Sequence, residues 1–231
     1  IMSIPLPNDD LRAGQVKMTV NERVALIQKE IERHTPPFRV SVNHTFALVY
    51  VDGLSSCETF VLQALYASRK FPCPYMGGSA GGKLDFVNTY IYDNETVTEN
   101  HAVVTLVRLT KPYRYGIFKT QAVDRTGDVF TVINANTSLR YIETVDDGSG
   151  QSVSFIRALQ RRFNCNTVDE LNKILQSYTF ATDINGEDFI RSIAAIDEAN
   201  DHINFFCDVV SGEKLYLLKR TSLADTIQRG I

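Results

Sequence analysis

The chain has 231 residues, 44% of them hydrophobic, so it is long enough for one large domain or two small ones with a packed core. Lysine and arginine total 24 against 27 aspartate and glutamate, and the sequence has no basic block of the kind that binds nucleic acid. No apolar run approaches the roughly 18 residues that cross a membrane, so we expect neither nucleic-acid binding nor direct membrane insertion.

The first predicted element is an amphipathic helix over residues 16–33. Its apolar residues recur at spacings of three and four, and the pattern ends before two consecutive prolines. These apolar residues are Val20, Val24, Ile27 and Ile31. A continuous apolar run over residues 46–51 follows, which is typical of a central strand covered on both faces.

A second helix is predicted directly after this strand. The strand stops at Asp52-Gly53. Ser55 and Glu58 then have the spacing of a capping box, in which two side chains satisfy N–H groups at a helix start. The helix should continue to about residue 70, where two nearby prolines end it. The order of strand, turn, helix and loop indicates an α/β unit.

The next segment, residues 75–86, contains four glycines, a serine and an alanine between apolar residues. Glycine is favoured where a Cβ atom would collide with backbone or with a ligand. The segment does not match a phosphate-binding P-loop, because the glycine spacing differs and neither serine nor threonine follows Lys83. We predict a loop of close approach, which is either a ligand-binding surface or a tight crossing between layers.

The remaining elements predict an α+β (mixed α/β) fold. Further strands are predicted over residues 86–92, 102–109, 115–123, 128–133, 139–143, 189–196, 202–209 and 214–218, and helices begin near residues 153, 167 and 222. The turn-prone Asp93-Asn94 joins the first two of these strands into a hairpin, and residues 124–127 form another turn. We expect two lobes of mixed or antiparallel sheet with helices outside, residues 1–112 and 113–231.

Ser79 is the candidate nucleophile, because Gly77 and Gly81 bracket it in a G-x-S-x-G match. In that motif the serine joins a strand to a following helix, whereas here prolines precede the serine and a predicted strand follows it. A serine hydrolase therefore stays an alternative that requires His44 or His101 near the Ser79 hydroxyl.

Neither histidines nor cysteines are spaced as a metal site. The four histidines are dispersed, and the cysteines form no C-x-x-C pair. These cysteines are Cys57, Cys73, Cys165 and Cys207. Their dispersal also argues against a disulfide framework and favours a reduced, cytoplasmic setting. No cofactor is predicted; haem stays an alternative, since it needs only one axial histidine, which spacing does not reveal.

Asp52 and Asp85 stand after the apolar strand and after the glycine segment, at ends of elements where α/β sheets bind ligands. Turn capping is the competing explanation, above all for Asp52 before Gly53. The residues that we predict to bind a ligand are Asp52, Gly77, Gly78, Ser79, Ala80, Gly81 and Asp85.

The order of these motifs resembles the FIST (F-box and intracellular signal transduction) domain. Residues 51–54 before a capped helix, then residues 76–81, then the strand over residues 102–109 resemble the later half of its N-terminal module. Residues 191–197 and 203–217 resemble its C-terminal module.

This resemblance implies a cytoplasmic sensory domain of a bacterial-type signal-transduction protein. Such a domain binds a small ligand, an amino acid or a metabolite, and passes its state to an output module of the parent chain, for example a chemoreceptor or a histidine kinase. It is not itself an enzyme, and some members of the family resemble haem proteins. The family carries an earlier α/β half, which we expect to be partly missing here. A protein-interaction scaffold without a small ligand is the alternative function.

Overall fold

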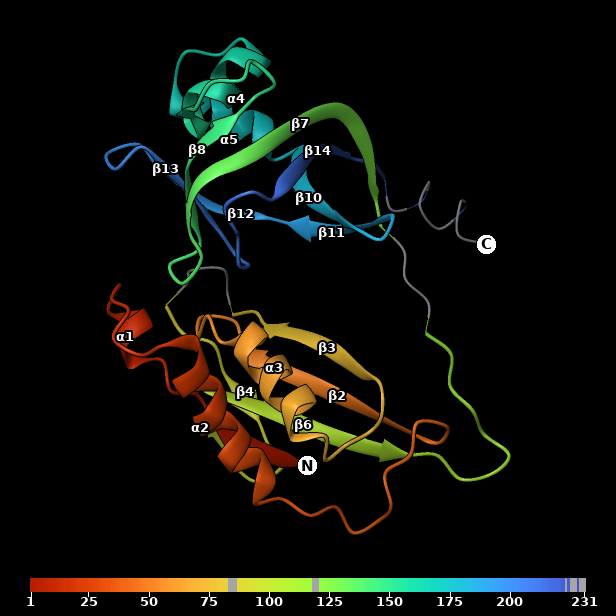
Figure 1. The fold of residues 1–231 in the computed structure, drawn as a ribbon. Helices are drawn as coiled ribbons and strands as arrows, with labels where there is room; N and C mark the ends of the chain where they lie inside the picture. The colour runs from red at the N-terminus through yellow and green to blue at the C-terminus, as the bar shows by residue number, and fades with distance from the viewer. Residues whose placement is uncertain (83–86, 118–120, 223, 225–227, 229–231) are drawn as a thin grey trace. The chain divides into compact units, whose positions relative to one another are not determined.

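The computed structural model describes residues 1–82, 87–117, 121–222, 224 and 228. It divides into two compact units, Ile1–Ile117 and Phe118–Ile231, each with helices and a sheet of its own (Figure 1). The predicted α+β class is confirmed. The predicted lobe boundary at residues 112 and 113 lies just before this division. None of the described helices is long and apolar enough to span a membrane.

The first unit is built on a four-stranded sheet in the order β1-β6-β2-β3. Strands β2 and β3 run parallel, and the other neighbours are antiparallel. The strands and helices of the unit are β1 (Met2–Pro5), α1 (Asp9–Arg12), α2 (Val20–Glu32), β2 (Thr45–Asp52), α3 (Glu58–Ser68), β3 (Tyr75–Ala80), β4 (Ile91–Tyr92), β5 (Val97–Thr98) and β6 (His101–Arg108). Of these, β1, α1, β3 and β5 were not predicted from the sequence.

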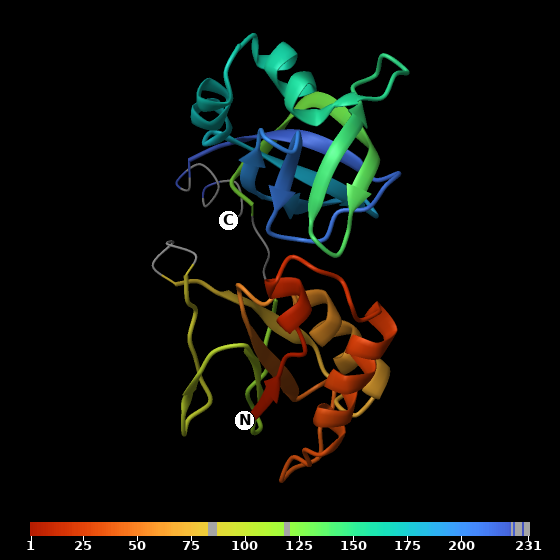
Figure 2. The same ribbon diagram turned by 90° about the vertical axis from the view of Figure 1, so that its left-hand side faces the viewer.

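Helices α2 and α3 cover one face of this sheet, and β4 packs on part of the other (Figure 2). Along β2 the alternate residues Ala47, Val49 and Val51 are buried against the helices. On the opposite face, Tyr50 is 47% exposed. The prediction of a strand covered on both faces was therefore wrong for one face, where the β4–β5 hairpin leaves Tyr50 exposed.

The start of α3 also differs from the prediction. Ser56 adopts a positive φ of 56°, which a helix cannot include, so α3 begins at Glu58. The Ser55 hydroxyl oxygen accepts a hydrogen bond from the Cys57 backbone N–H at 3.2 Å. Glu58 does not complete a capping box but accepts a hydrogen bond from Ser79. The Ser55 side chain therefore forms its hydrogen bond within the turn before α3 and does not cap the helix.

The predicted hairpin around Asp93-Asn94 forms with a different partner. The turn joins β4 to the short strand β5, and the Asp93 carboxylate accepts hydrogen bonds from the N–H groups of Glu95 and Thr96. Strand β6 instead lies between β1 and β2. Its consecutive residues 102–104 are all buried, so β6 suits an inner position in the sheet.

The second unit contains an antiparallel sheet in the order β11-β10-β14-β7-β8-β13-β12, with β9 beside β8. Its elements are β7 (Val123–Asn136), β8 (Tyr141–Asp146), β9 (Val153–Ser154), α4 (Phe155–Phe163), α5 (Val168–Leu175), β10 (Tyr178–Ile184), β11 (Glu187–Arg191), β12 (Ile193–Asp197), β13 (His202–Phe205) and β14 (Lys214–Arg220). Phenylalanine rings pack in the core of this unit. The centroid of the Phe155 ring lies 5.5 Å from that of Phe130 and 5.4 Å from that of Phe180.

Strand β7 extends the predicted strand over residues 128–133 at both ends, whereas residues 115–117, 121 and 122 of the predicted strand over 115–123 are not in a strand and residues 118–120 lie outside the described residues. Residues 126–128 of β7 lie opposite the single residue Leu217, so the predicted turn at residues 124–127 is a bulge within β7. The Thr126 hydroxyl donates to the Leu217 carbonyl oxygen at 3.0 Å. Strand β10 was not predicted, and most of the helix predicted after residue 222 lies outside the described residues.

Candidate functional site

The glycine segment is a strand rather than a loop. Residues Tyr75–Ala80 form β3, which pairs in parallel with β2 at an edge of the sheet. Tyr75 anchors its start: the hydroxyl donates to the Phe71 carbonyl oxygen at 2.8 Å, and the ring meets that of Tyr66 edge-on at 5.2 Å. Burial raises the pKa of Tyr75 to about 12. The segment from α3 is thereby fixed before the glycines begin.

The four glycines of the segment differ in whether the surrounding structure would accept a Cβ atom. A Cβ atom on Gly77 would lie 1.8 Å from the Val49 carbonyl oxygen, and one on Gly82 would lie 2.5 Å from the Asn88 carbonyl oxygen. These two glycines are therefore required by the approach of neighbouring backbone. A Cβ atom on Gly78 or Gly81 would meet no atom within 4 Å. Packing within the described part of the chain leaves these two positions open to larger residues.

Asp52 is buried at the carboxyl end of β2, and its carboxylate joins three segments. Oδ1 accepts hydrogen bonds from the Leu54 N–H at 2.9 Å and from the Thr89 hydroxyl. Oδ2 accepts one from the Asn100 N–H at 2.6 Å. The turn-capping contact is thus present. Because both oxygens are occupied by the protein, Asp52 shapes this end of the sheet rather than presenting an open acceptor.

Ser79 lies opposite Val51 on β3, and its hydroxyl donates to Glu58 Oε1 at 2.9 Å. His44 precedes Val51 by seven residues, roughly 20 Å along an extended strand. His101 is on β6, across β2 from Ser79, and its Nδ1 lies 2.7 Å from the Glu99 carbonyl oxygen. Neither histidine is placed to take a proton from Ser79, as the hydrolase alternative requires.

Two asparagines that sequence reasoning missed also belong to this end of the sheet. Asn8 is fully buried, and its Nδ2 donates to the Ser55 carbonyl oxygen at 2.8 Å. Asn100 Nδ2 donates to the Leu6 carbonyl oxygen at 3.1 Å. The Oδ1 atoms of both side chains are buried without a hydrogen-bond partner among the described residues. A single asparagine in a loop carries no sequence signal for such a role, because its partners are distant in the chain.

The predicted ligand-binding residues therefore divide into three groups, of which the first, Asp52, Gly77 and Ala80, is held by contacts within the fold. Ala80, opposite Asp52, brings its carbonyl oxygen to the Gly53 N–H at 3.2 Å, so β2 and β3 end together at the turn before α3. Gly78, Ser79 and Gly81 line the exposed edge beside that turn. Asp85 lies outside the described residues.

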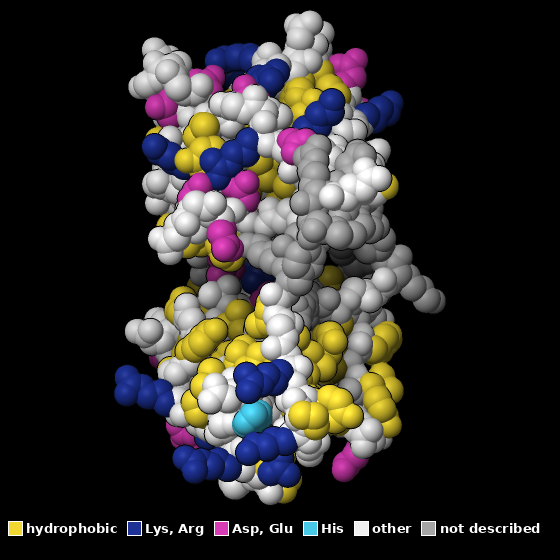
Figure 3. All heavy atoms as spheres, turned by 90° about the vertical axis from the view of Figure 1, so that its right-hand side faces the viewer, with side chains coloured by type: hydrophobic (Ala, Val, Ile, Leu, Met, Phe, Trp, Pro, Cys, Tyr) yellow, Lys and Arg dark blue, Asp and Glu magenta, His cyan; other side chains and the backbone are white. Residues whose placement is uncertain are grey.

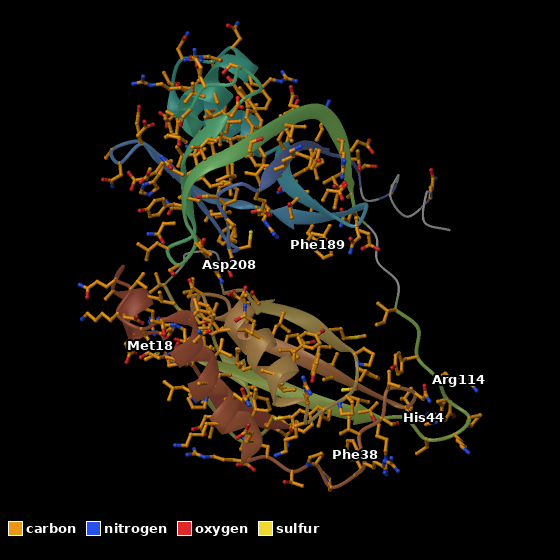
Figure 4. All side chains as sticks on the ribbon, in the orientation of Figure 1. Met18, Phe38, His44, Arg114, Phe189 and Asp208 are labelled. Atoms are coloured by element: carbon orange, nitrogen blue, oxygen red, sulfur yellow. The ribbon has the colours of Figure 1, made fainter. Side chains whose placement is uncertain are left out.

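Three cavities lined by described residues lie elsewhere. The largest, about 870 Å³, lies between α1 and α2 and is lined in part by Asn8, Met18 and Leu26 (Figure 4). One of about 420 Å³ is next to the Arg162 to Asp128 ion pair in the second unit. Another of about 420 Å³ is lined by His44 and Arg114, among others. None of the predicted ligand-binding residues lines these three cavities.

The cavities of the first unit differ in their histidine content, which bears on the haem alternative. The largest has no histidine in its lining, and the one lined by His44 is about half its volume and otherwise lined largely by polar residues. His202 stacks on Tyr141 with ring centroids 4.3 Å apart and lies 3.6 Å from the Asp197 carboxylate. Within the described ranges, no group of three or more histidine, cysteine or acidic side chains is placed to hold a metal ion.

Comparison with known proteins gives one family match. A family model described as the FIST N domain matches residues 1–147. No curated protein and no solved structure matches the chain. The family match covers the whole first unit and continues through β7 and β8 of the second.

Proposed function

The chain belongs to the FIST family of signal-transduction sensory domains, and from this premise we propose that its first unit binds a small ligand at the carboxyl ends of β2 and β3. The ligand is an amino acid or a related metabolite, as the family resemblance implies. The unit reports the bound ligand to an output module of the parent protein, in the cytoplasm and without catalysing a reaction.

The observation that carries this proposal is the open space at Gly78 and Gly81. A Cβ atom there would meet no atom of the described residues within 4 Å, so packing within the described part of the chain gives no reason for glycine at either position. A ligand that approaches the backbone closely supplies such a reason. Gly78 lies in the middle of β3, and Gly81 follows the strand directly. Gly78 is paired with Tyr50 and Ser79 with Val51. The open space at Gly78 and the Ser79 side chain are therefore on opposite faces of the sheet, while both glycines lie close to Ser79 in the chain.

The position of this edge in the fold also supports a ligand site. Strand β2, helix α3 and strand β3 form a parallel β-α-β unit, and open α/β sheets bind ligands beyond the carboxyl ends of their strands. The N-terminus of α3 lies at this edge, since Glu58 at its first turn contacts Ser79. Helix N-terminal N–H groups attract carboxylates, which every amino acid carries.

The binding test is a thermal-shift screen of the protein against amino acids and small metabolites. We expect at least one ligand to raise the melting temperature in a saturable way. Gly78→Val and Gly81→Val should abolish that shift while the unliganded melting temperature stays close to wild type. Gly116→Val is the matched control, because Gly116 also has open space but lies in another part of the unit. It should retain the shift.

Two results would contradict the proposal. One is the lack of any stabilising ligand at saturating concentration. The other is unfolding of both glycine variants, which would make Gly78 and Gly81 packing residues after all.

A protein-interaction surface is the second candidate, favoured by exposed apolar side chains around the β4–β5 hairpin. Tyr90, Tyr92 and Val97 are 58%, 61% and 66% exposed. Ile91 between the two tyrosines is buried against the sheet, so the tyrosines point away from it. In the parent protein, Tyr92→Glu should abolish output under this candidate while the ligand-induced thermal shift persists. If Tyr92→Glu leaves output unchanged, the surface has no such role.

A further inference from the structure

We propose that the cavity beside His44 and Arg114 is a second binding site, which takes the carboxylate or phosphate group of a small organic anion. It goes beyond the ligand site proposed above, since His44 precedes β2 whereas that site lies at the other end of the strand. The two sites share no residue.

The walls of this cavity are held by contacts between two segments. The cavity has a volume of about 420 Å³, within the range of roughly 300–1,000 Å³ typical of small-molecule sites. It is lined by Val42, Asn43, His44, Arg114 and Tyr115. The Leu109 N–H donates to the His44 carbonyl oxygen at 2.8 Å, and the Tyr115 hydroxyl donates to the Val42 carbonyl oxygen. The Tyr115 ring also meets Phe46 edge-on at 5.5 Å.

The two chain segments that line the cavity are free of acidic residues although the chain as a whole has a net charge of -3. Between Glu32 and Asp52, and again between Glu99 and Asp124, the sequence contains no acidic residue. The register of β2 and β6 brings these two segments side by side at the cavity. Of the basic residues in these segments, Arg114 and His44 line the cavity, and Arg39, Arg108 and Lys111 lie within six residues of one of them in the chain. Figure 3 shows lysine and arginine side chains gathered around a histidine on one face of the molecule.

Arg114 is the residue that makes this charge available to a ligand. It makes no hydrogen bond or ion pair within the described part of the chain, whereas Arg23 and Arg33 of the same unit pair with Asp10 and Glu30. A guanidinium group presents a planar fork of N–H donors that fits a carboxylate or a phosphate with two parallel hydrogen bonds. An unpaired arginine that lines a cavity is thus prepared for an oxyanion.

Neighbouring groups add to the arginine. His44 Nδ1 is buried without a hydrogen-bond partner among the described residues, so this ring nitrogen remains able to form a hydrogen bond with a ligand. Asn43 contributes a side-chain amide to the lining. The Arg108 guanidinium lies over the Phe38 ring at 5.0 Å, which holds a second positive charge near this end of the sheet. The set combines positive charge with neutral donors, as oxyanion sites do.

The test is calorimetric titration of the full chain with sodium phosphate and with sodium succinate, against sodium chloride at matched ionic strength. We expect saturable binding of at least one oxyanion and none of chloride. The anion that binds with the higher affinity shows whether the site prefers a phosphate or a carboxylate group. Arg114→Gln should weaken binding by about tenfold or more, as expected for hydrogen bonds to a charged group. Arg39→Gln removes the same charge from an exposed neighbour outside the lining and should weaken it less than about threefold.

Further variants test the two proposed sites independently. Gly78→Val changes the first proposed site and should leave oxyanion binding at Arg114 unchanged, so a negative result at the first site would not count against the second. Arg114→Lys keeps the positive charge but lacks the planar fork of donors, so it should bind the oxyanion more weakly than wild type. If Arg114→Gln fails to fold, Arg114→Lys and Asn43→Ala, each made separately, provide the test. The proposal is overturned if neither oxyanion binds saturably, or if Arg39→Gln weakens binding as much as Arg114→Gln.

Discussion

Gly77 and Gly78 are neighbours in β3, yet only one of them is constrained by the fold. The carbonyl of Val49 on β2 occupies the space of a Cβ atom at Gly77, whereas the space beside Gly78 is open. Two neighbouring aspartates of α1, Asp9 and Asp10, likewise differ in their contacts with the rest of the unit. Asp10 contacts Arg23, whose side chain is only 1% exposed, whereas Asp9 in the same short helix is exposed.

The first prediction concerns the two glycines. Gly77→Ala should lower the free energy of unfolding by about 2 kcal/mol or more, because a rigid backbone carbonyl must move. Gly78→Ala should leave it unchanged or raise it by up to about 1 kcal/mol, because alanine restricts the unfolded chain. Urea denaturation of both variants measures the difference. Equal stability of the two would show that the β2 backbone adapts.

The second prediction concerns acid stability through Asp10. Its hydrogen bond with Arg23, helped by the Lys17 and Met18 N–H groups, holds the pKa of Asp10 well below its usual range. A carboxylate with a lowered folded pKa stabilises the protein above its unfolded pKa of about 3.9, and this contribution is lost as the pH falls toward the folded value.

Wild type should therefore lose more stability between pH 6 and pH 3 than Asp10→Asn, which lacks the titrating group. Asp9→Asn is the control and should follow wild type. Melting temperatures across this pH range provide the measurement. An identical acid dependence of wild type and Asp10→Asn would exclude Asp10 as a source of acid sensitivity.

At the scale of elements, helix starts show how local and tertiary effects combine. Helix α2 begins with a complete capping box, in which Thr19 and Glu22 exchange backbone hydrogen bonds. The helix predicted to begin near residue 167 is α5, and the Thr167 hydroxyl oxygen caps it by accepting a hydrogen bond from the Glu170 N–H at 3.2 Å. The capping-box spacing at Ser55 was misleading, because the strand before it ends in a turn organised by Asp52. A capping pattern thus predicts a helix start only where the preceding chain is unconstrained.

The third prediction follows from the capping box of α2. Thr19→Ala should lower the free energy of unfolding by about 1 kcal/mol, because the Glu22 N–H loses its acceptor. Thr19→Ser keeps the hydroxyl and should stay within a few tenths of a kcal/mol of wild type. Chemical denaturation distinguishes the two. If serine is as destabilising as alanine, the threonine methyl group matters more than the cap.

At the scale of the whole molecule, two separate hydrophobic cores account for the two units. One core joins the first sheet to α2 and α3, and the other joins the second sheet to α4 and α5. The family match ends at residue 147, after β8 and therefore inside the second unit. Strands β7 and β8 pair there with β14 and β13, which lie beyond the matched residues. The extent of the family model and the division of the fold are thus different boundaries.

The fourth prediction tests that difference with fragments. Residues 1–117 should fold cooperatively by themselves, because their core is complete. Residues 1–147 should bind the dye ANS and aggregate more readily, because buried residues of β7 and β8 such as Phe130 and Ile142 lose their partner strands. Thermal melts and ANS fluorescence compare the fragments. Equal behaviour would mean that β7 and β8 are stable without β13 and β14.

The sequence by itself determined the α+β class, the amphipathic helix α2, the central strand β2 and the family, because these depend on periodicity and on the order of motifs along the chain. Only the tertiary structure decided that the glycine segment is an edge strand, since glycines have no side-chain pattern and take their conformation from the partner strand.

The tertiary structure also decided which residues meet. Asp52 contacts Thr89 and Asn100, which are 37 and 48 residues away in the chain. The cavity at His44 exists because β2 and β6 are antiparallel neighbours, which places Arg114 beside a residue 70 positions earlier. Periodicity reports which face of an element is buried, but the choice of partner depends on packing between elements far apart in the chain.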